Sequence, residues 1–470
     1  MPPRRKPVPT AAAAASKADS RTEHFAAYRL EPEVSGLPDP DGVAPAFLRF
    51  DVLDVDLAIV NSLRRAIMAD VKTAAAVFDA TGEGRGTIRF MRNTTALHNE
   101  FMGLRVSLTP IHFDENQLFL FERAASAGGP GRAAQPIEQF RFSIREANNN
   151  DAKVVNVTTR NVRVTDAAGA AVPQAVRDAL FPPSPTSGDH VLLVRLKPRA
   201  GGVEELHVEF QAQLGSGSTR GAAFSPVSQC FFRNKVDPAA FERSLAERIS
   251  RVQQQAEADG AGAASVDVAA VRQQHAALEG QRDFVRDANG DPSAFEFVLK
   301  SETRLRPAYI VLSGMTALLA KVRRFQMGLR DAASDYVRVS AAANVADFYE
   351  VAVRGEDHTL GNMVQAMLYR RWVRDGKSAD VSFVGYSQPH PQEDVVVFKL
   401  KLSRAGDDLR ARMDDGLAWL QDRLRDLRDE WIRFRALEAV RDGAGKPLDA
   451  VLEVVGERTT LAKVVAADRP

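Results

Sequence analysis

Two short polar runs contain the side chains of this sequence that are best suited to chemistry. Glu356, Asp357 and His358 stand side by side, and carboxylates beside an imidazole are the groups that usually move protons in general acid–base catalysis. Arg64 and Arg65 form the second run, and guanidinium groups bind carboxylates or backbone carbonyls of a partner through paired hydrogen bonds. The elements that position these runs decide between catalysis and binding.

The arginine pair falls in a predicted helix that follows a predicted strand. Residues 48–55 alternate between apolar and polar side chains, which is typical of a half-buried strand. Asp56 stands where a helix N-cap belongs. After it, apolar residues recur at three- and four-residue steps and predict one buried helix stripe, made of Leu57, Val60, Leu63, Ile67 and Val71. Asn61, Arg64 and Arg65 lie on the flank of this stripe.

The same design returns about three hundred residues later. Residues 349–357 alternate in the same way, and Asp357 takes the place of Asp56 when Asn362 is aligned with Asn61. A second helical stripe follows at Leu360, Val364, Met367, Leu368 and Trp372. Two strand–cap–helix units with one Asp…Asn frame indicate an internal repeat and therefore two related halves.

This placement argues against catalysis by the Glu–Asp–His run. Adjacent residues at the start of a helix do not converge on one reacting atom, so we expect Asp56 and Asp357 to be helix caps and His358 to be structural. The arginines have two interpretations. They bind a partner protein, or local acids such as Asp70 satisfy them.

Composition limits the remaining possibilities. The 470 residues carry 62 basic and 61 acidic side chains and a net charge of +1, so the chain as a whole has no electrostatic footprint for independent nucleic-acid binding. One cysteine, Cys230, rules out a disulfide framework and a cysteine-rich metal site. No apolar run reaches the roughly 18 residues of a membrane span. The N-terminus does not resemble a signal peptide.

The pattern along the chain predicts an α+β fold with two paired units and an α+β insert. We expect a disordered tail over 1–44, the first unit over 45–113 and 222–330, the insert over 114–221, a linker over 331–343, the second unit over 344–437 and an extension over 438–470. Predicted insert strands include 117–122, 140–144, 153–158, 190–196 and 205–213, whereas 241–286 has helical propensity.

Each unit ends on a long striped helix, and such a stripe requires a facing helix. The simplest partner for each helix is the other one in the same chain. The predicted seam consists of Val311, Met315, Leu318 and Val322 with Leu417, Leu420, Leu424 and Leu427.

Several of these stretches resemble a known family. The sequences NSLRRAIMADV, RNTTALHNEF and FSPV, which begin at Asn61, Arg92 and Phe224, resemble alpha-type RNA polymerase subunits such as the third subunit of eukaryotic polymerase II and its archaeal counterpart. RGEDHTLGNMVQAML and FVGYSQPHP, which begin at Arg354 and Phe383, resemble the small eleventh subunit. A fusion in this order resembles the form carried by large nucleocytoplasmic DNA viruses.

The resemblance implies a non-catalytic platform for polymerase assembly, in which two dimerisation domains pair and carry the two large catalytic subunits. It implies large-subunit contacts at Asn61, Arg64, Arg65, Glu100 and Arg105. Expected partners are the largest and second-largest polymerase subunits and a small subunit-10-like protein, with DNA met only through the complex and no membrane. The insert lacks the cysteines that hold metal in several relatives, so no cofactor is expected.

The resemblance also implies a location in a nucleus or in a viral factory of an infected cell. Two alternatives stay open: a dimerisation scaffold outside transcription, and an enzyme whose site lies in the insert. The sequence contains no phosphate-binding or dinucleotide-binding glycine motif that would favour the enzyme.

Overall fold

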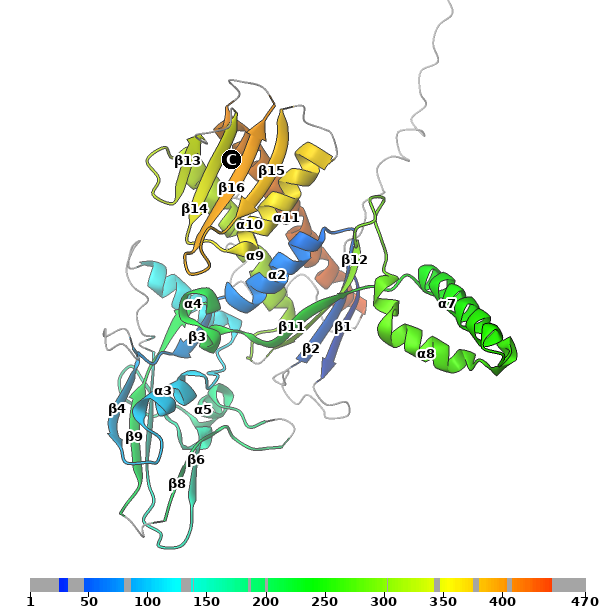
Figure 1. Cartoon of the computed structure of the whole chain (residues 1–470). Coiled ribbons are helices and arrows are strands. Elements are labelled where there is room, and N and C mark those ends of the chain that lie inside the picture. Colours follow the sequence, from blue (N-terminus) through cyan, green and yellow to red (C-terminus); the bar gives the residue numbers. More distant parts are fainter. Residues whose placement is uncertain are drawn as a thin grey trace, which may run out of the picture. The chain divides into compact units, whose positions relative to one another are not determined.

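The computed structural model describes residues 25–32, 46–79, 86–127, 137, 139–184, 187–198, 202–301, 303–341, 347–374, 380–403 and 408–441. The chain forms two compact units. The smaller comprises Met1–Ala26, Asp51–Val55 and Asn234–Phe295, and we call it the hairpin unit. The larger comprises Ala27–Phe50, Asp56–Arg233 and Glu296–Pro470, and we call it the main unit. The fold is mixed α and β with several sheets, as predicted (Figure 1).

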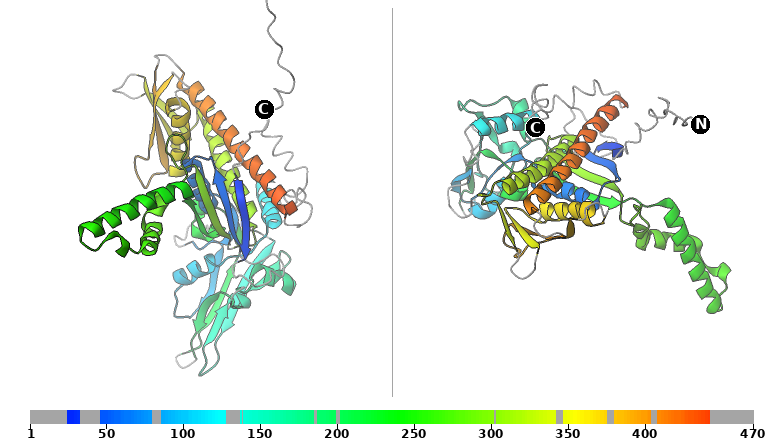
Figure 2. Two further views of the ribbon diagram at one scale, coloured as in Figure 1. Left: turned by 90° about the vertical axis from the view of Figure 1, so that its right-hand side faces the viewer. Right: turned by 90° about the horizontal axis from the view of Figure 1, so that it is seen from above.

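Four helices form the centre of the main unit. They are α2 (Leu57–Ala69), α9 (Pro307–Arg330), α10 (His358–Tyr369) and α11 (Leu409–Arg441). Helix α2 packs against both α9 and α10, and α9 packs along α11. Figure 2 shows α9 and α11 side by side in two views. Because α2 touches two helices, it is buried on more than one face. Leu57 was predicted to belong to the buried stripe of α2, but its side chain is 40% exposed.

The second repeated unit is built on a four-stranded antiparallel sheet. Its order is β13 (Val337–Ala341), β14 (Phe348–Arg354), β16 (Val395–Leu402) and β15 (Val381–Ser387). One face buries Val351, Val353, Phe398 and Leu400, as period-two alternation requires. Helix α10 packs against β15 and β16 (Figure 1) and continues into a short π-helix, η5 (Arg370–Arg374).

A second four-stranded sheet has the order β1 (Phe25–Pro32), β2 (Ala46–Leu53), β12 (Ala294–Ser301) and β11 (Val227–Asn234). The predicted disordered tail is therefore wrong where β1 lies, and residues 1–24 and 33–45 lie outside the described part of the chain. Phe50 stacks on Phe297 at 5.2 Å and lies 4.7 Å from the Trp431 ring of α11. Strand β2 leads into α2 as β14 leads into α10, which is the predicted repeat.

The described residues of the insert form three small sheets. The largest has the order β4 (Ile88–Asn93), β9 (Glu205–Phe210), β5 (Phe140–Ala147) and β7 (Arg163–Asp166). The other pairs are β6 (Val155–Thr158) with β8 (Leu192–Leu196), and β3 (Thr73–Ala76) with β10 (Ala212–Gly215). Its helices are α3 (Asn99–Ser107), α4 (Glu115–Ala127), α5 (Gln174–Leu180) and α6 (Gly217–Arg220).

Two predicted boundaries change, and one predicted strand is part of a helix. The insert begins before residue 114, because β4 pairs with β9. The linker over 331–343 contains β13, whose Val337 is 2% exposed and which pairs with β14, so the second unit begins earlier than predicted. The predicted strand over 117–122 is part of helix α4. Gln117 N donates to Asp114 Oδ1 at 2.8 Å and Gln117 Oε1 accepts from Asp114 N at 3.0 Å, and this reciprocal cap favours the helix.

The hairpin unit contains the predicted helical stretch as two helices, α7 (Pro238–Ala258) and α8 (Val268–Leu278). Asp237 and Asp267 cap their N-termini. Leu245, Val271 and His275 are buried between them. Two ion pairs join α7 to α8 and to the residue that follows α8. They are Glu242 with Arg272 and Arg248 with Glu279.

Candidate assembly interface

The repeated aspartates cap their helices as the sequence predicts. Asp56 Oδ1 accepts a hydrogen bond from Ala58 N at 2.8 Å, and Asp357 Oδ1 accepts one from Thr359 N at 2.8 Å. A cap of this kind satisfies one of the backbone amides that has no partner inside the helix. Each carboxylate keeps its second oxygen for another partner.

The second oxygen of each aspartate binds an arginine from the other repeated unit. Arg370 Nη1 lies 3.1 Å from Asp56 Oδ2, and Arg65 Nη2 lies 2.6 Å from Asp357 Oδ2. The start of each helix thus meets the later part of the other one, so α2 and α10 run antiparallel. Asp56 and Asp357 therefore act as caps and as ionic contacts at the same time.

Arg65 binds the start of α10 through more than one group. Its Nε donates to Thr359 Oγ1 at 2.8 Å, and the neighbouring Ser62 Oγ donates to Thr359 O at 3.1 Å. Burial works against the charge of Asp357, but hydrogen bonds from Thr359 and the Arg65 guanidinium outweigh burial and lower the pKa of this carboxyl. The Arg65 guanidinium is thus engaged within the chain, and its predicted contact with a large subunit stays a prediction.

Arg64 points to neighbours on its own helix. Its Nε donates to Asn61 Oδ1 at 3.1 Å, and both side chains are half-buried. Asp70, the acid proposed to satisfy the arginines locally, instead lies 3.4 Å from Lys321 Nζ on α9. The arginines therefore do not share one partner.

A second ionic cluster joins α2, α9 and the start of α10, and the sequence did not indicate it. Lys321 Nζ lies 3.1 Å from Glu356 Oε2 as well as close to Asp70, and Tyr336 OH donates to Glu356 Oε1 at 2.8 Å. Burial raises the pKa of the Asp70 carboxyl. Burial alone would lower the pKa of Lys321, but the two carboxylates outweigh it and raise that pKa. Only the position of Glu356 beside the repeated aspartate could have drawn attention to the cluster.

Glycines stand where the helices cross most closely. A Cβ at Gly314 of α9 would lie 2.8 Å from Ile67 Cγ1, and one at Gly416 of α11 would lie 2.6 Å from Leu368 Cδ2. Ile67 and Leu368 are equivalent positions of the repeat, so the two glycines are equivalent as well. No other residue type fits these approaches without displacing its neighbour.

The predicted seam between the long helices is present. Its eight members are all buried in the contact between α9 and α11: Val311, Met315, Leu318, Val322, Leu417, Leu420, Leu424 and Leu427. Trp431 Nε1 donates to Ala308 O at 3.2 Å at one end of the contact, and Arg330 Nε lies 2.5 Å from Asp414 Oδ1 toward the other. The two helices are therefore antiparallel.

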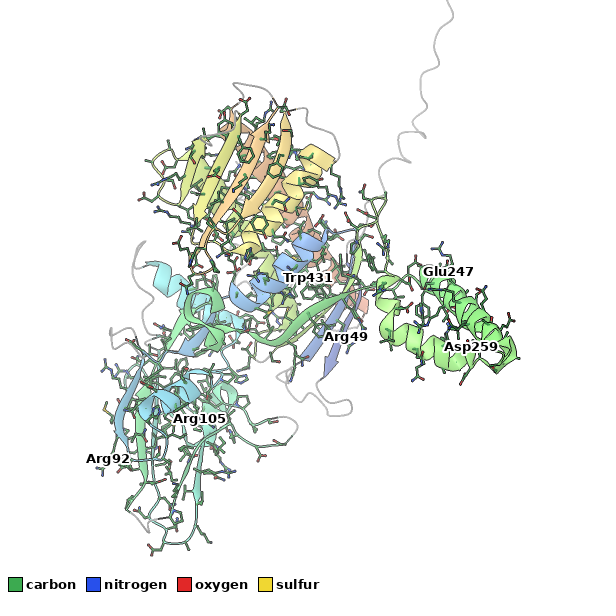
Figure 3. The ribbon with its side chains drawn as sticks, viewed as in Figure 1. Arg49, Arg92, Arg105, Glu247, Asp259 and Trp431 are labelled. Carbon is green, nitrogen blue, oxygen red and sulfur yellow. The ribbon has the colours of Figure 1, made fainter. Side chains whose placement is uncertain are left out.

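Helix α3 has a different character. Arg105, predicted for a large-subunit contact, donates to the carbonyls of Leu193 and Leu192 at 2.7 and 2.8 Å and so holds β8 (Figure 3). Glu100 is exposed. Three large apolar side chains on α3 and its C-cap are at least half exposed: Phe101 at 58%, Leu104 at 50% and Leu108 at 56%.

The Glu–Asp–His run does not assemble a catalytic centre. Glu356 turns to Lys321 and Asp357 to Arg65, whereas His358 is exposed and packs edge-on against Tyr386 at 5.9 Å between ring centroids. Asn362 is half-buried, and its side chain forms no hydrogen bond with the described residues. Adjacent side chains that diverge in this way cannot act on one substrate atom.

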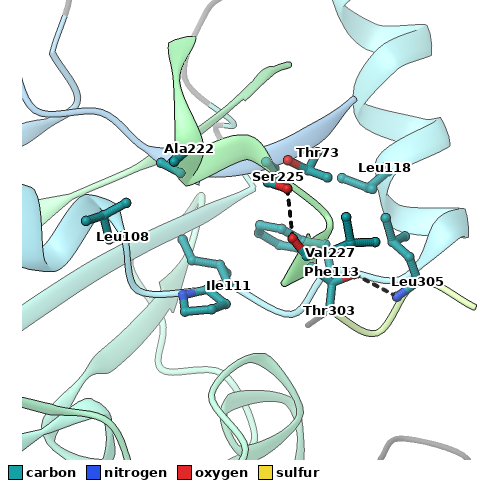
Figure 4. Close-up of a pocket in the computed structure, with 13 residues that line it drawn as sticks. Thr73, Leu108, Ile111, Phe113, Leu118, Ala222, Ser225, Val227, Thr303 and Leu305 are labelled. Atoms are coloured by element: carbon teal, nitrogen blue, oxygen red, sulfur yellow. Dashed lines mark hydrogen bonds between the residues drawn. The ribbon is translucent and has the colours of Figure 1, made fainter. Parts of the chain in front are cut away.

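A small cavity of about 130 Å³ lies between β3, the start of β11 and the loop after α3 (Figure 4). Its lining is apolar apart from three hydroxyl side chains and contains no titratable side chain. Thr73 Oγ1 and Ser225 Oγ already donate to the carbonyls of Phe224 and Val227, at 2.8 and 2.9 Å. The cavity therefore offers no acid–base group to an enzyme.

Among the described residues, no group of three or more His, Cys, Asp or Glu side chains is arranged to hold a metal ion. No helix of the described residues is both long and apolar enough to cross a membrane.

Comparison with known proteins identifies the class of domain first. Residues 349–430 match the model of the RNA polymerase Rpb3/Rpb11 dimerisation domain. This range runs from β14 through α10 and the sheet into α11. The match thus covers the second repeated unit. It includes α10, which contacts α2 at what we call the junction, and α11, which forms the seam with α9.

Particular relatives include two kinds of polymerase subunit. The chain is 28% identical over 213 residues to DNA-directed RNA polymerases I and III subunit RPAC1 of Bos taurus, covering 43% of this chain and 56% of the relative. The human protein of that name gives 27% with the same coverage. DNA-directed RNA polymerase subunit Rpo11 of Saccharolobus solfataricus is 38% identical over 55 residues, covering 12% of this chain and 52% of the relative. The chain spans about half the length of these relatives. Together the similarities support an alpha-type RNA polymerase subunit.

Proposed function

We propose that this chain is the assembly-platform subunit of a multisubunit DNA-directed RNA polymerase, with a subunit-3-like and a subunit-11-like half joined and paired within one polypeptide. The observation that supports this best is the reciprocal contact of α2 and α10. Each N-cap aspartate receives an arginine of the other half, Asp56 from Arg370 and Asp357 from Arg65. The matched dimerisation domain supplies one of these two helices.

Fusion gives the pairing a simple physical advantage. Two domains on one chain meet at the effective concentration set by their connection, commonly millimolar for a short linker. Their association therefore does not depend on the cellular concentration of a second subunit. Such a fused platform suits a compact enzyme of the kind that the sequence resemblance associates with large DNA viruses, working in a nucleus or in a viral factory.

The exposed face of α3 is the best-supported surface for the large subunits. Phe101, Leu104 and Leu108 lie on it with Glu100 beside them. Clustered apolar side chains at a surface usually mark a protein contact. Asn61 and Arg64, half-buried on α2, remain further candidates. The proposed partners are the largest and second-largest polymerase subunits and a small subunit-10-like protein. The chain itself is non-catalytic in this proposal.

The test is capture from cells that express the native polymerase. A tagged full-length chain should copurify two very large polymerase subunits. Phe101→Asp/Leu104→Asp should lose most of the larger subunits while its thermal melt stays near that of the wild type. A matched control, Val268→Asp/Leu278→Asp, changes exposed apolar residues of α8 and should capture as the wild type does. Absence of polymerase subunits from the wild-type capture would overturn the proposal.

A further inference from the structure

One face of the insert sheet β4–β9–β5–β7 is open. Its other face is buried, through Phe142, Ile144, Val164, Leu206, Val208 and Phe210. Because successive strand residues point to opposite faces, the residues between these positions share the open side. The strand register fixes the rows across the sheet: Arg89 stands opposite Glu209, Glu209 opposite Ser143, and Ser143 opposite Arg163.

Five arginines lie on this open side, and we call them the arginine face: Arg89, Arg92, Arg141, Arg145 and Arg163. All five are exposed. Arg92 Nε lies 3.0 Å from Glu205 Oε2, and Glu209 lies 3.6 Å from His207 Nε2. The other four arginines have no ion pair or side-chain hydrogen bond with a described residue. Five arginines less Glu205 and Glu209 leave +3 on this face, whereas the whole chain carries +1.

The spacing of the arginine face is set by the backbone. Arg141 and Arg145 lie two residues on either side of Ser143 on β5, and Arg163 lies opposite Ser143 on β7. Strands are about 4.8 Å apart and residues about 3.4 Å apart along a strand, so the positions of these arginines repeat at roughly 7–14 Å. The face is therefore a rigid array of cations, different from a flexible basic tail.

The composition of the face indicates the kind of anion. Guanidinium groups match phosphate oxygens through two parallel hydrogen bonds, and no lysine, phenylalanine, tyrosine or tryptophan stands among the described residues that these pairings place on the open side. Single-stranded nucleic acid is usually held by base stacking on aromatic side chains. A duplex offers a stiff and regular row of phosphates without stacking, one charge per about 1.7 Å of axis.

We propose that the arginine face contacts the phosphate backbone of a nucleic-acid duplex. This inference concerns the insert alone and stands whether or not the two repeated units pair. It replaces the expectation that DNA is met only through other subunits. About four phosphate contacts correspond to a slope near −3.6 in log K against log salt. Binding should then weaken about a hundredfold between 50 and 200 mM salt.

The experiment measures fluorescence anisotropy of a labelled 20-base-pair DNA duplex with the full-length chain over a series of KCl concentrations. The variant Arg89→Ala/Arg141→Ala/Arg145→Ala/Arg163→Ala removes the four uncompensated charges. The matched control Arg243→Ala/Arg251→Ala/Arg338→Ala/Arg354→Ala removes four other exposed arginines. Thermal melts of all three proteins establish that they are folded.

We expect the wild type and the control to bind the duplex with the steep salt dependence given above. The four-arginine variant should lose at least tenfold in affinity and most of the slope of log K against log salt. A wild type that does not bind at 50 mM salt would overturn the proposal, as would a variant that binds with the wild-type slope. Tighter binding of a 20-nucleotide single strand or of polyglutamate than of the duplex would also overturn it, because the array would then serve another partner.

Discussion

The two contacts that join the repeated units use different chemistry. The seam of α9 and α11 is mainly apolar and deeply buried, and each long helix presents apolar residues at three- and four-residue steps. The junction of α2 and α10 is ionic and only partly buried, with Arg65 and Asp357 side chains 37% and 42% exposed. Apolar stripes stabilise the contact by removing apolar surface from water, but they do not strongly define the register, that is, which turn of one helix faces which turn of the other. The charged caps Asp56 and Asp357 do, because each carboxylate binds one arginine of the other unit, so the junction defines the register that the seam stabilises.

The largest expected effect comes from placing charge in the seam. Leu420 and Leu424 are 0% and 4% exposed, and burying an unpaired carboxylate costs several kcal/mol or more, in addition to roughly 2–5 kcal/mol for each lost leucine. Leu420→Asp/Leu424→Asp should therefore unfold the main unit or separate the two halves. A thermal melt and size-exclusion chromatography measure this. Leu278→Asp, at a site 71% exposed, is the control and should change little.

The glycine crossings provide a test in which the expected sign is reversed. Gly→Ala inside a helix usually stabilises by up to about 1 kcal/mol through helix propensity. At Gly416 the added methyl would lie 2.6 Å from Leu368 Cδ2 and Trp372 Cζ2, and such overpacking costs about 1–3 kcal/mol. Gly416→Ala and Gly314→Ala should lower the melting temperature. A raised melting temperature for either would show that the helices do not approach so closely.

The adjacent arginines provide an internal comparison at the junction. Arg65→Ala removes the contacts to Asp357 and Thr359 and should lower the free energy of unfolding by about 1–2 kcal/mol. This loss is smaller than for a fully buried ion pair, because the site is partly exposed to water. Arg64→Ala should stay within about 0.5 kcal/mol. A double-mutant cycle of Arg65→Ala with Asp357→Asn, followed by chemical denaturation, isolates the pair. Equal effects of the two single arginine variants would contradict this assignment.

The repeat could be predicted because it is local. Period-two strands, an aspartate cap and a helical stripe are all visible within about twenty residues of sequence, and the long seam follows from apolar spacing alone. The partners of Arg65, Lys321 and β4 could not be predicted, because they lie far away in the chain and depend on how elements pair. Residues 117–122 form a helix and not the expected strand, because a short apolar run fits either element and the Asp114–Gln117 cap decides between them.

The smallest expected effect is a pH dependence of the junction. The Asp357 carboxyl has a pKa below its ordinary 3.8 in the folded chain. The stabilisation that it provides is therefore fully present above the unfolded pKa and is lost as pH falls through the lower folded value. The melting temperatures of wild type and Asp357→Asn should differ at pH 6, and the difference should begin to shrink only as pH falls below about 4. A difference that grows on acidification would contradict the direction of the shift.

The central claim is that the two repeated units pair within one chain, and cleavage of the connection tests it most directly. A protease site inserted between Ala332 and Ala333, which are both exposed and lie between α9 and β13, allows the folded full-length protein to be cut. We expect the two fragments to elute together as a one-to-one complex after dilution to micromolar concentration. Fragments that separate while each keeps a folded circular-dichroism spectrum would contradict the account.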